Sequence, residues 1–231
     1  MDQAHTDQAP RERLSRDRVL HAAISLADHA GLEALSMRRL GQQLGVEAMS
    51  LYNHVANKDE VLDGMVDLVF SEIGLPPQGV DWQTAMRQRA QSVLAALSAH
   101  TWAIGLLESR RRPGPANLRH HDAVLGCLRT AGFPIPLAAH AYSLLDSYIY
   151  GFALEQASLP FTTPEETVAL AESILQGVPA DAYPHLAELT VEHVLQPGYN
   201  YADEFEFGLT LILDGLEQQL SRQNKPPPAT R

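Results

Sequence analysis

The chain has 231 residues, of which 45% are hydrophobic, so it is long enough to bury a sizeable core in one or two domains. Its net charge of −11 excludes a protein that binds polyanions over its whole surface. A single cysteine, Cys127, excludes a disulfide within the chain, and there is neither a signal segment nor a run of about 18 apolar residues. We therefore expect a cytoplasmic protein that does not enter a membrane.

The charge is unevenly spread along the chain. Residues 11–58 hold seven lysines and arginines against five acids, so the excess of acid lies outside this segment, mostly after it. A mildly basic head on an acidic body indicates nucleic-acid contact by the head alone. Four of the arginines, at positions 11, 13, 16 and 18, form either a solvated face or a set of phosphate contacts.

Helical periodicity dominates the sequence. Helix starts are marked by capping residues or by a proline in the first turn, at Ser15, Ser36, Asn57, Asp81, Pro136 and Thr163. The expected helices cover residues 16–30, two short stretches within 36–55, then 58–73, 82–97, 117–130, 136–159, 164–176, 184–195 and 203–222, with a short apolar piece at 102–107. Strand patterns, glycine-rich phosphate loops and repeats are absent from the sequence, so we predict an all-α fold.

The pattern predicts four segments. Residues 1–13 are polar and residues 224–231 are rich in proline, so both are expected to be disordered. Residues 14–75 form a small head, which a proline–glycine run separates from a larger helical body at residues 80–223.

The head contains a helix-turn-helix pattern between Ser36 and Lys58. Gly45 separates its two helices and is placed to adopt the left-handed conformation that ends the first one. Leu51 and Val55 are four residues apart and anchor the second helix, whose other side is polar. A second helix of this kind fits the major groove of DNA.

Two helices of the body carry much apolar surface. The 136–159 helix is apolar nearly all round, which indicates a helix covered on most sides. The 203–222 helix gathers one apolar stripe, made of Phe205, Leu209, Ile212, Leu213, Leu216 and Leu220. An exposed stripe of this kind is a solubility hazard, so we expect a partner surface to cover it.

Residues with catalytic or metal-binding chemistry do not form a convincing cluster. His120, His121 and Asp122 are adjacent in sequence, but successive residues of a helix point about 100° apart, so they do not share a face. Cys127 has no charged activating neighbour in sequence and is interpreted as a buried thiol. We expect neither a catalytic site nor a metal site.

The run Leu35–Asp59 resembles the DNA-binding head of TetR-family transcriptional repressors, most specifically in the pattern Leu-Tyr-x-His-Val-x-Asn-Lys at residues 51–58. The body resembles the C-terminal domain of the tetracycline-repressor subgroup through the segment Gly151–Glu155 and the run Arg110–Pro115. The resemblance implies a homodimer, joined through the helices that begin at Pro136 and Asp203. Its two heads would read a palindrome with half-sites one or more helical turns, roughly 34 Å, apart.

Carried over residue by residue, the resemblance implies two sets of DNA contacts. Phosphate contacts fall on Arg38, Tyr52, His54 and Lys58, whose side chains are suitable donors. Base edges would be read by Ala48, Met49 and Ser50, with Asn53 as a further candidate. The tetracycline repressors have a glutamine where this chain has Ala48, which offers only a methyl group, so we expect a different operator.

The same resemblance implies an effector site in the body. The matching or neighbouring positions are Arg89, Val93, Trp102, Leu107, Tyr142, Asp146 and Glu155. Leu107 stands where the tetracycline repressors have a metal-binding histidine, so we expect an apolar or aromatic small molecule in place of a magnesium–tetracycline complex, and no cofactor. The apolar members also fit an ordinary core, Asp146 fits either the pocket or a salt bridge at the dimer interface, and an arginine of 110–112 faces either ligand or solvent.

We therefore predict a ligand-responsive transcriptional repressor that a small-molecule effector releases from DNA. Two alternatives stay open: a DNA-binding regulator without a small-molecule effector, and a helical enzyme with a vestigial DNA-binding head. Turnover of a candidate ligand would favour the enzyme, whereas the absence of any stabilising ligand would favour the effector-free regulator.

Overall fold

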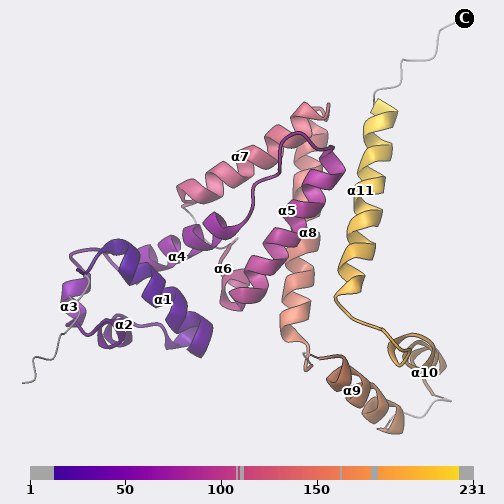
Figure 1. Ribbon diagram of the computed structural model, residues 1–231, viewed down its shortest axis with the longest axis horizontal. Coiled ribbons are helices and arrows are strands. Elements are labelled where there is room, and N and C mark those ends of the chain that lie inside the picture. Colours follow the sequence, from indigo (N-terminus) through magenta and orange to yellow (C-terminus); the bar gives the residue numbers. More distant parts are fainter. Residues whose placement is uncertain (1–12, 108, 110–111, 162, 178–181, 224–231) are drawn as a thin grey trace, which may run out of the picture. The chain divides into compact units, whose positions relative to one another are not determined.

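The computed structural model describes residues 13–107, 109, 112–161, 163–177 and 182–223 (Figure 1). These residues form helices joined by turns, and none of them lies in a strand, so the predicted all-α fold is confirmed. They divide into two compact units, which we call the first unit (Met1–Ile73 with Ala99–His121) and the second unit (Gly74–Ser98 with Asp122–Arg231). The expected disordered arm 1–13 and tail 224–231 lie outside the described residues, except for Arg13.

The first unit begins with the helices of the predicted head. They are α1 (Arg16–Ala30), η1 (Leu32–Ala34), α2 (Met37–Leu44), α3 (Ala48–Leu51) and α4 (Lys58–Glu72). The predicted caps at Ser15, Ser36 and Asn57 are confirmed, because their side-chain oxygens accept hydrogen bonds from backbone N–H groups three residues later. The second predicted helix of the helix-turn-helix is one turn long and continues into turns that end at Val55.

One apolar core holds these helices together. Leu20, Leu40, Leu51 and Met65 come from α1, α2, α3 and α4 and are each at most 1% exposed. Burial of a side chain of this size contributes roughly 1.5–3 kcal/mol. At Gly64 of α4, a Cβ atom would lie 2.7 Å from both methyl carbons of Leu20, so glycine is what permits this close approach of α4 to α1.

The first unit also contains a segment that we expected in the body. This segment comprises η2 (Thr101–Ala103), α6 (Ile104–Leu107) and the start of α7 (Pro115–Thr130). The backbone N–H groups of Ala116 and Asn117 donate to the carboxylate of Asp67 on α4, at 2.8 and 3.1 Å. A carboxylate from another helix thus caps α7, which is why α7 begins at Pro115 and not at the predicted residue 117. Residues 99–121 therefore group with the head, unlike the expected division at 14–75 and 80–223.

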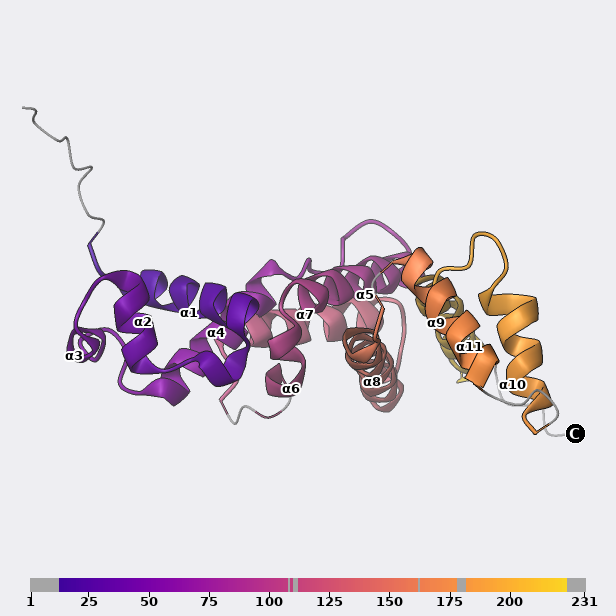
Figure 2. The same cartoon turned by 90° about the horizontal axis from the view of Figure 1, so that it is seen from below.

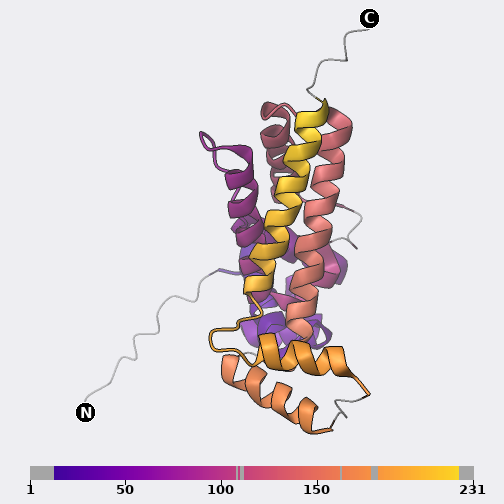
Figure 3. The same ribbon diagram turned by 90° about the vertical axis from the view of Figure 1, so that its right-hand side faces the viewer.

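The second unit contains the remaining helices. They are α5 (Trp82–Ala99), the rest of α7, α8 (Ile135–Ser158), α9 (Pro164–Gly177), α10 (Pro184–Leu189), the π-helical turn η3 (Thr190–Val194) and α11 (Asp203–Gln223). The predicted cap of α5 is confirmed, because Asp81 Oδ1 accepts from Thr84 N–H at 2.9 Å. The predicted capping box of α9 is also confirmed, with both Thr163–Glu166 hydrogen bonds at 3.2 Å. Figures 2 and 3 both show α9 and α10 next to each other.

Helices α8 and α11 pack side by side (Figure 3). The hydroxyl of Tyr148 on α8 lies 3.1 and 3.0 Å from the carbonyl oxygens of Glu204 and Phe205. A Cβ atom on Gly208 would lie 2.2 Å from this hydroxyl, so the two helices meet closely at this glycine.

The packing of α11 within the chain corrects the expectation that a partner surface covers the Phe205–Leu220 stripe. Five of its six members pack within the chain and are at most 6% exposed: Phe205, Leu209, Leu213, Leu216 and Leu220. A second stripe on α11 is exposed in its place, with Phe207 at 66% and Leu211 at 59%. Within the described part of the chain, no single helix is long and apolar enough to cross a membrane, and only α5 taken together with residues 101–107 reaches that composition.

Candidate nucleic-acid interface and effector site

Backbone contacts fix the angle between α2 and α3. Gly45 has a left-handed conformation, with φ at 68°, and its N–H closes the end of α2. The N–H of Val46 donates to the carbonyl of Gly41 at 2.9 Å. A Cβ atom on Gly41 would lie 2.9 Å from the carbonyl oxygen of Val46 and 3.1 Å from the nitrogen of Ala48. The start of α3 thus rests directly on the backbone of α2.

This arrangement presents the predicted DNA-contact residues to solvent. Leu51 and Val55 are 0% and 2% exposed and hold the α3 segment on the core. Met49 is 75% exposed and Tyr52 is 45% exposed, although large apolar and aromatic side chains are usually buried. Arg38, Asn53 and Lys58 are also exposed, and Ala48, Ser50 and His54 are partly exposed. All eight predicted residues are therefore accessible to a macromolecular ligand, and all belong to the first unit.

The charge around the start of α4 restricts where a polyanion can contact this unit. Lys58 is the first residue of α4, where backbone N–H groups favour an anion. A hollow of about 550 Å³ beside it is lined by the carboxylates of Asp59, Glu60 and Asp63, with Arg112 at the same site. Carboxylates repel phosphate, so this hollow does not suit a phosphate backbone, whereas α2, the α3 turn and Lys58 present accessible donors that do.

A buried ion pair marks the predicted effector site in the second unit. Arg89 on α5 and Asp146 on α8 have side chains that are 0% and 10% exposed, and their closest nitrogen and oxygen atoms are 2.5 Å apart. The guanidinium also lies 5.8 Å from the centre of the Tyr142 ring. Val93 follows Arg89 by one turn of α5 and is fully buried. Four of the seven predicted residues are thus found together, and the partner of Asp146 is Arg89 of the same chain.

The other three predicted effector residues lie elsewhere. Trp102 and Leu107 belong to the first unit, where the indole N–H of Trp102 donates to Asp28 at 2.6 Å. Glu155 is nine residues beyond Asp146 on α8, which is roughly 13 Å along a helix. Its neighbour is Tyr201: burial first, then the charge and hydrogen bond of Glu155, raise the pKa of the tyrosine to about 12.

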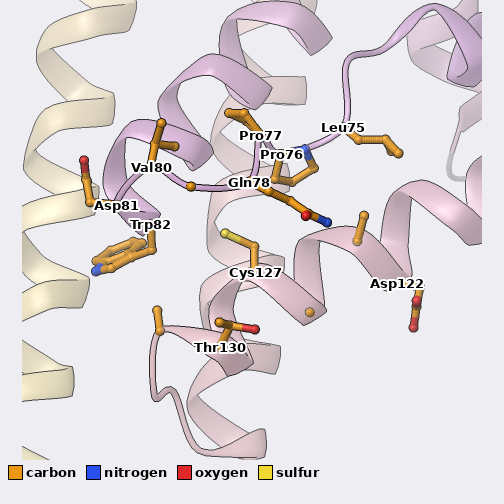
Figure 4. Close-up of a pocket in the computed structure, with 14 residues that line it drawn as sticks. Leu75, Pro76, Pro77, Gln78, Val80, Asp81, Trp82, Asp122, Cys127 and Thr130 are labelled. Carbon is orange, nitrogen blue, oxygen red and sulfur yellow. The ribbon is translucent and has the colours of Figure 1, made fainter.

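A second-unit cavity lies apart from all seven predicted effector residues (Figure 4). It has a volume of about 1100 Å³ and lies between the connector before α5 and one side of α7. Leu75, Pro76 and Pro77 line it from the connector, and Cys127 and Thr130 line it from α7. Burial raises the pKa of the Cys127 thiol, so the thiol is protonated near neutral pH and is a weak nucleophile.

Sequence reasoning missed four polar residues that tie the first unit together. Asp28 and Glu72 hydrogen-bond to the ring of His100, and Asp67 caps α7. These partners are 72, 28 and 49 residues apart in sequence, so helical periodicity carries no signal for them. Within the described ranges, no group of three or more histidine, cysteine or acidic side chains is arranged to hold a metal ion.

Comparison with known proteins matches both parts of the chain. A family model described as bacterial regulatory proteins, tetR family, matches residues 19–65, and one described as tetracyclin repressor-like, C-terminal domain, matches residues 75–220. The HTH-type transcriptional repressor DrrR1 of Streptomyces coeruleorubidus is 35% identical over 219 residues, which cover 91% of this chain and 80% of that protein. The tetracycline repressor protein class C of Escherichia coli is 29% identical and covers 89% of this chain and 92% of that protein.

Solved structures also match most of the chain. Apo ActR from Streptomyces coelicolor is similar with a TM-score of 0.73 and 30% identity, over 94% of this chain and 99% of that chain. ActR in complex with actinorhodin is similar with a TM-score of 0.71 and 31% identity, over 90% of this chain and 99% of that chain.

Proposed function

Because the chain belongs to the TetR family of bacterial regulatory proteins and is a ligand-responsive transcriptional repressor, we propose that it binds a palindromic operator as a homodimer and that a small-molecule effector releases it. The observation that carries this proposal is the pairing of buried and exposed residues in the α3 segment. Leu51 and Val55 fix the segment, while Met49 is 75% exposed and Tyr52 is 45% exposed. Exposed apolar and aromatic side chains on a helix-turn-helix are suited to base edges and sugar–phosphate groups.

A duplex selected from a random-sequence library by the full-length protein provides the DNA for the test. Tyr52→Ala and Lys58→Ala are expected to weaken binding similarly on all selected sequences, and Lys58→Ala should reduce the slope of log affinity against log salt by about 1. Met49→Ala and Asn53→Ala are expected to change which bases are preferred. Arg222→Ala, which removes an exposed charge from the end of α11, is the charge-matched control. Unchanged affinity of both Tyr52→Ala and Lys58→Ala would refute the interface.

We propose that the dimer forms through the exposed sides of α8 and α11. Phe207 and Leu211 are one turn apart on α11, and Leu144 and Leu154 are 46% and 57% exposed on α8. Burial of apolar surface drives association, so these side chains are suited to a four-helix seam. Phe207→Glu with Leu211→Glu is expected to give monomers in sedimentation. Leu118→Glu, at a side chain 56% exposed on α7, should leave the dimer intact. Monomeric wild-type protein would refute the seam.

For the effector, we propose an apolar or aromatic small molecule that contacts the cluster of Arg89, Val93, Tyr142 and Asp146. The buried ion pair and the aromatic ring offer hydrogen bonds and a flat surface among apolar helices, which is the usual composition of a ligand site. The solved ActR complex contains actinorhodin, which supports an organic effector for this chain. Leu107 cannot bind a metal, so a magnesium–tetracycline complex is disfavoured.

The effector proposal is tested with a panel of multi-ring aromatic compounds and, separately, tetracycline with magnesium. A true effector raises the unfolding temperature and also releases the protein from the selected duplex. Tyr142→Leu should abolish both effects, whereas Tyr183→Leu, at an exposed aromatic residue before α10, should abolish neither. If the many compounds of the panel neither raise the unfolding temperature nor change binding to the selected duplex, the effector-free regulator is favoured.

A further inference from the structure

His100 lies between two carboxylates in the first unit. Its Nδ1 atom is 2.8 Å from Asp28 Oδ1 and its Nε2 atom is 3.0 Å from Glu72 Oε2. The side chain of His100 is 11% exposed, against 27% for Asp28 and 49% for Glu72. Asp28 is near the end of α1, Glu72 is the last residue of α4, and His100 directly precedes η2. One imidazole ring therefore joins three elements.

This geometry is satisfied only by the protonated ring. An ionised carboxylate accepts hydrogen bonds and cannot donate them, and a neutral imidazole has a single N–H group. The neutral ring can therefore donate a hydrogen bond to one carboxylate and must turn a lone pair toward the other. The imidazolium has two N–H groups and serves both, with a favourable charge on each side.

The surroundings of the ring act in the same direction. Among the described residues, the charged groups within hydrogen-bonding distance of His100 are Asp28 from α1 and Glu72 from α4. Trp102, the second residue of η2, donates its neutral indole N–H to the same Asp28 oxygen. The centre of its ring lies 5.9 Å from that of the imidazole. Burial alone lowers the pKa of His100, but the hydrogen bonds and charges of Asp28 and Glu72 outweigh burial and raise the pKa above its ordinary value of 6.5.

We propose that His100 is a proton-dependent latch that fastens the ends of α1 and α4 to the η2–α6 segment and that this latch positions the DNA-binding head. This inference rests on the proposed operator binding. Helices α1 and α4 form the core on which α2 and α3 sit. A latched head has fewer conformations to lose when it binds DNA, so its operator affinity is higher than that of an unlatched head.

The direction of the pH effect follows from linkage. The pKa of His100 is higher in the folded protein than the value of 6.5 that applies to an unfolded chain. The stabilisation is therefore fully present below that unfolded value and is lost as the pH rises through the folded pKa. Operator affinity and stability of wild-type protein should both contain a component that declines between pH 6.5 and the folded pKa of His100.

The first measurement is the pKa of His100 itself. Histidine-labelled full-length protein is titrated by NMR, and the resonance is assigned with His100→Asn. We expect a pKa above 6.5 that falls in both Asp28→Asn and Glu72→Gln. Unfolding by urea at several pH values should show a decline that is present in wild type and absent in His100→Asn. An unshifted pKa, or identical pH profiles of unfolding, would overturn the latch.

The second measurement is affinity for the selected duplex between pH 6 and pH 9. We expect wild-type affinity to fall by roughly fivefold or more over this range, in addition to any change shared by all variants. His54 is a predicted phosphate contact and also carries an imidazole, so wild type and His100→Asn are also compared in a His54→Asn background. His29→Asn is the matched control, because His29 is exposed and its Nδ1 atom hydrogen-bonds within α1, to the carbonyl of Ser25.

The outcomes separate the latch from the proposed function. If His100→Asn removes the wild-type pH component and His29→Asn does not, the latch is supported. Should His100→Asn fail to fold, Glu72→Gln keeps the ring and is expected to shift the decline to lower pH; an unshifted decline would count against the proposal. If no duplex is selected at any pH, operator binding fails, while the NMR and unfolding profiles still decide whether the latch exists.

Discussion

The Arg89–Asp146 pair allows a sharp test of the energetics of the second unit. Asp146→Leu removes the acid and leaves a guanidinium whose side chain is 0% exposed. Removing one partner of a buried ion pair costs about 3–5 kcal/mol. Domains are stable by only about 5–15 kcal/mol, so the substitution should remove at least about a fifth of the total. The double variant Arg89→Met with Asp146→Leu removes both charges and keeps the volume, so it should range from neutral to about 4 kcal/mol more stable than wild type.

The assay is urea unfolding of wild type, the two single variants and the double variant, at one protein concentration because association contributes to stability. Each single variant should unfold at lower urea than the double variant. The reasoning would be wrong if the two single costs simply added in the double variant, since that would mean that each side chain acts without the other. A cost of Asp146→Leu below about 1 kcal/mol would show that the guanidinium reaches water after the change.

Three further substitutions test the first unit, each by urea unfolding with operator affinity as a second readout. Leu51→Ala empties a fully buried site under α3 and should cost about 2–5 kcal/mol. Asp67→Ala removes the carboxylate that accepts from two N–H groups of α7 and should cost about 0.5–2 kcal/mol; an unchanged midpoint would mean that water replaces it. Gly41→Ala forces a Cβ atom against the α3 backbone, which should lower the free energy of unfolding by about 1–3 kcal/mol. The higher helix propensity of alanine should offset about 1 kcal/mol of this loss. At an equal loss of stability, operator affinity should fall more in Gly41→Ala than in Asp67→Ala.

The helix boundaries were predictable because their signals are local. Ser15, Ser36, Asn57, Asp81 and Thr163 accept hydrogen bonds from groups three residues away, so each cap is decided within a short run of sequence. The early start of α7 was not predictable, because its capping carboxylate comes from Asp67, 49 residues away from Ala116. The grouping of residues 99–121 with the head has the same origin.

The face of α11 was mispredicted for a different reason. Two apolar stripes share this helix, one containing Phe205 and Leu209 and the other Phe207 and Leu211. Both stripes have helical spacing, and the longer stripe was assigned to a partner chain. In the structure the longer stripe packs within the chain, where α11 contacts α8 and also hydrogen-bonds to α5. Periodicity identifies a buried face but carries no information about which chain covers it.

The partner of Asp146 was also beyond sequence reasoning. A carboxylate on an apolar helix must find a counter-charge or water, and both a pocket and a dimer seam satisfied this requirement. Arg89 was predicted as an effector residue on separate grounds, and nothing in the spacing of 57 residues links the two side chains. The exposure of the candidate DNA contacts was easier to predict, because buried and exposed positions alternate within one short segment.

The contact of α3 with the backbone of Gly41 has a consequence for how this head could be redesigned. The angle of α3 is set by main-chain atoms of Gly41, Val46 and Ala48, and not by the outward side chains. Met49 and Asn53 can thus be substituted to change which DNA sequence is preferred, while the backbone that positions them stays the same. A library randomised at these two positions should therefore yield folded regulators with many different DNA preferences, whereas one randomised at position 41 should yield few that fold as this head does.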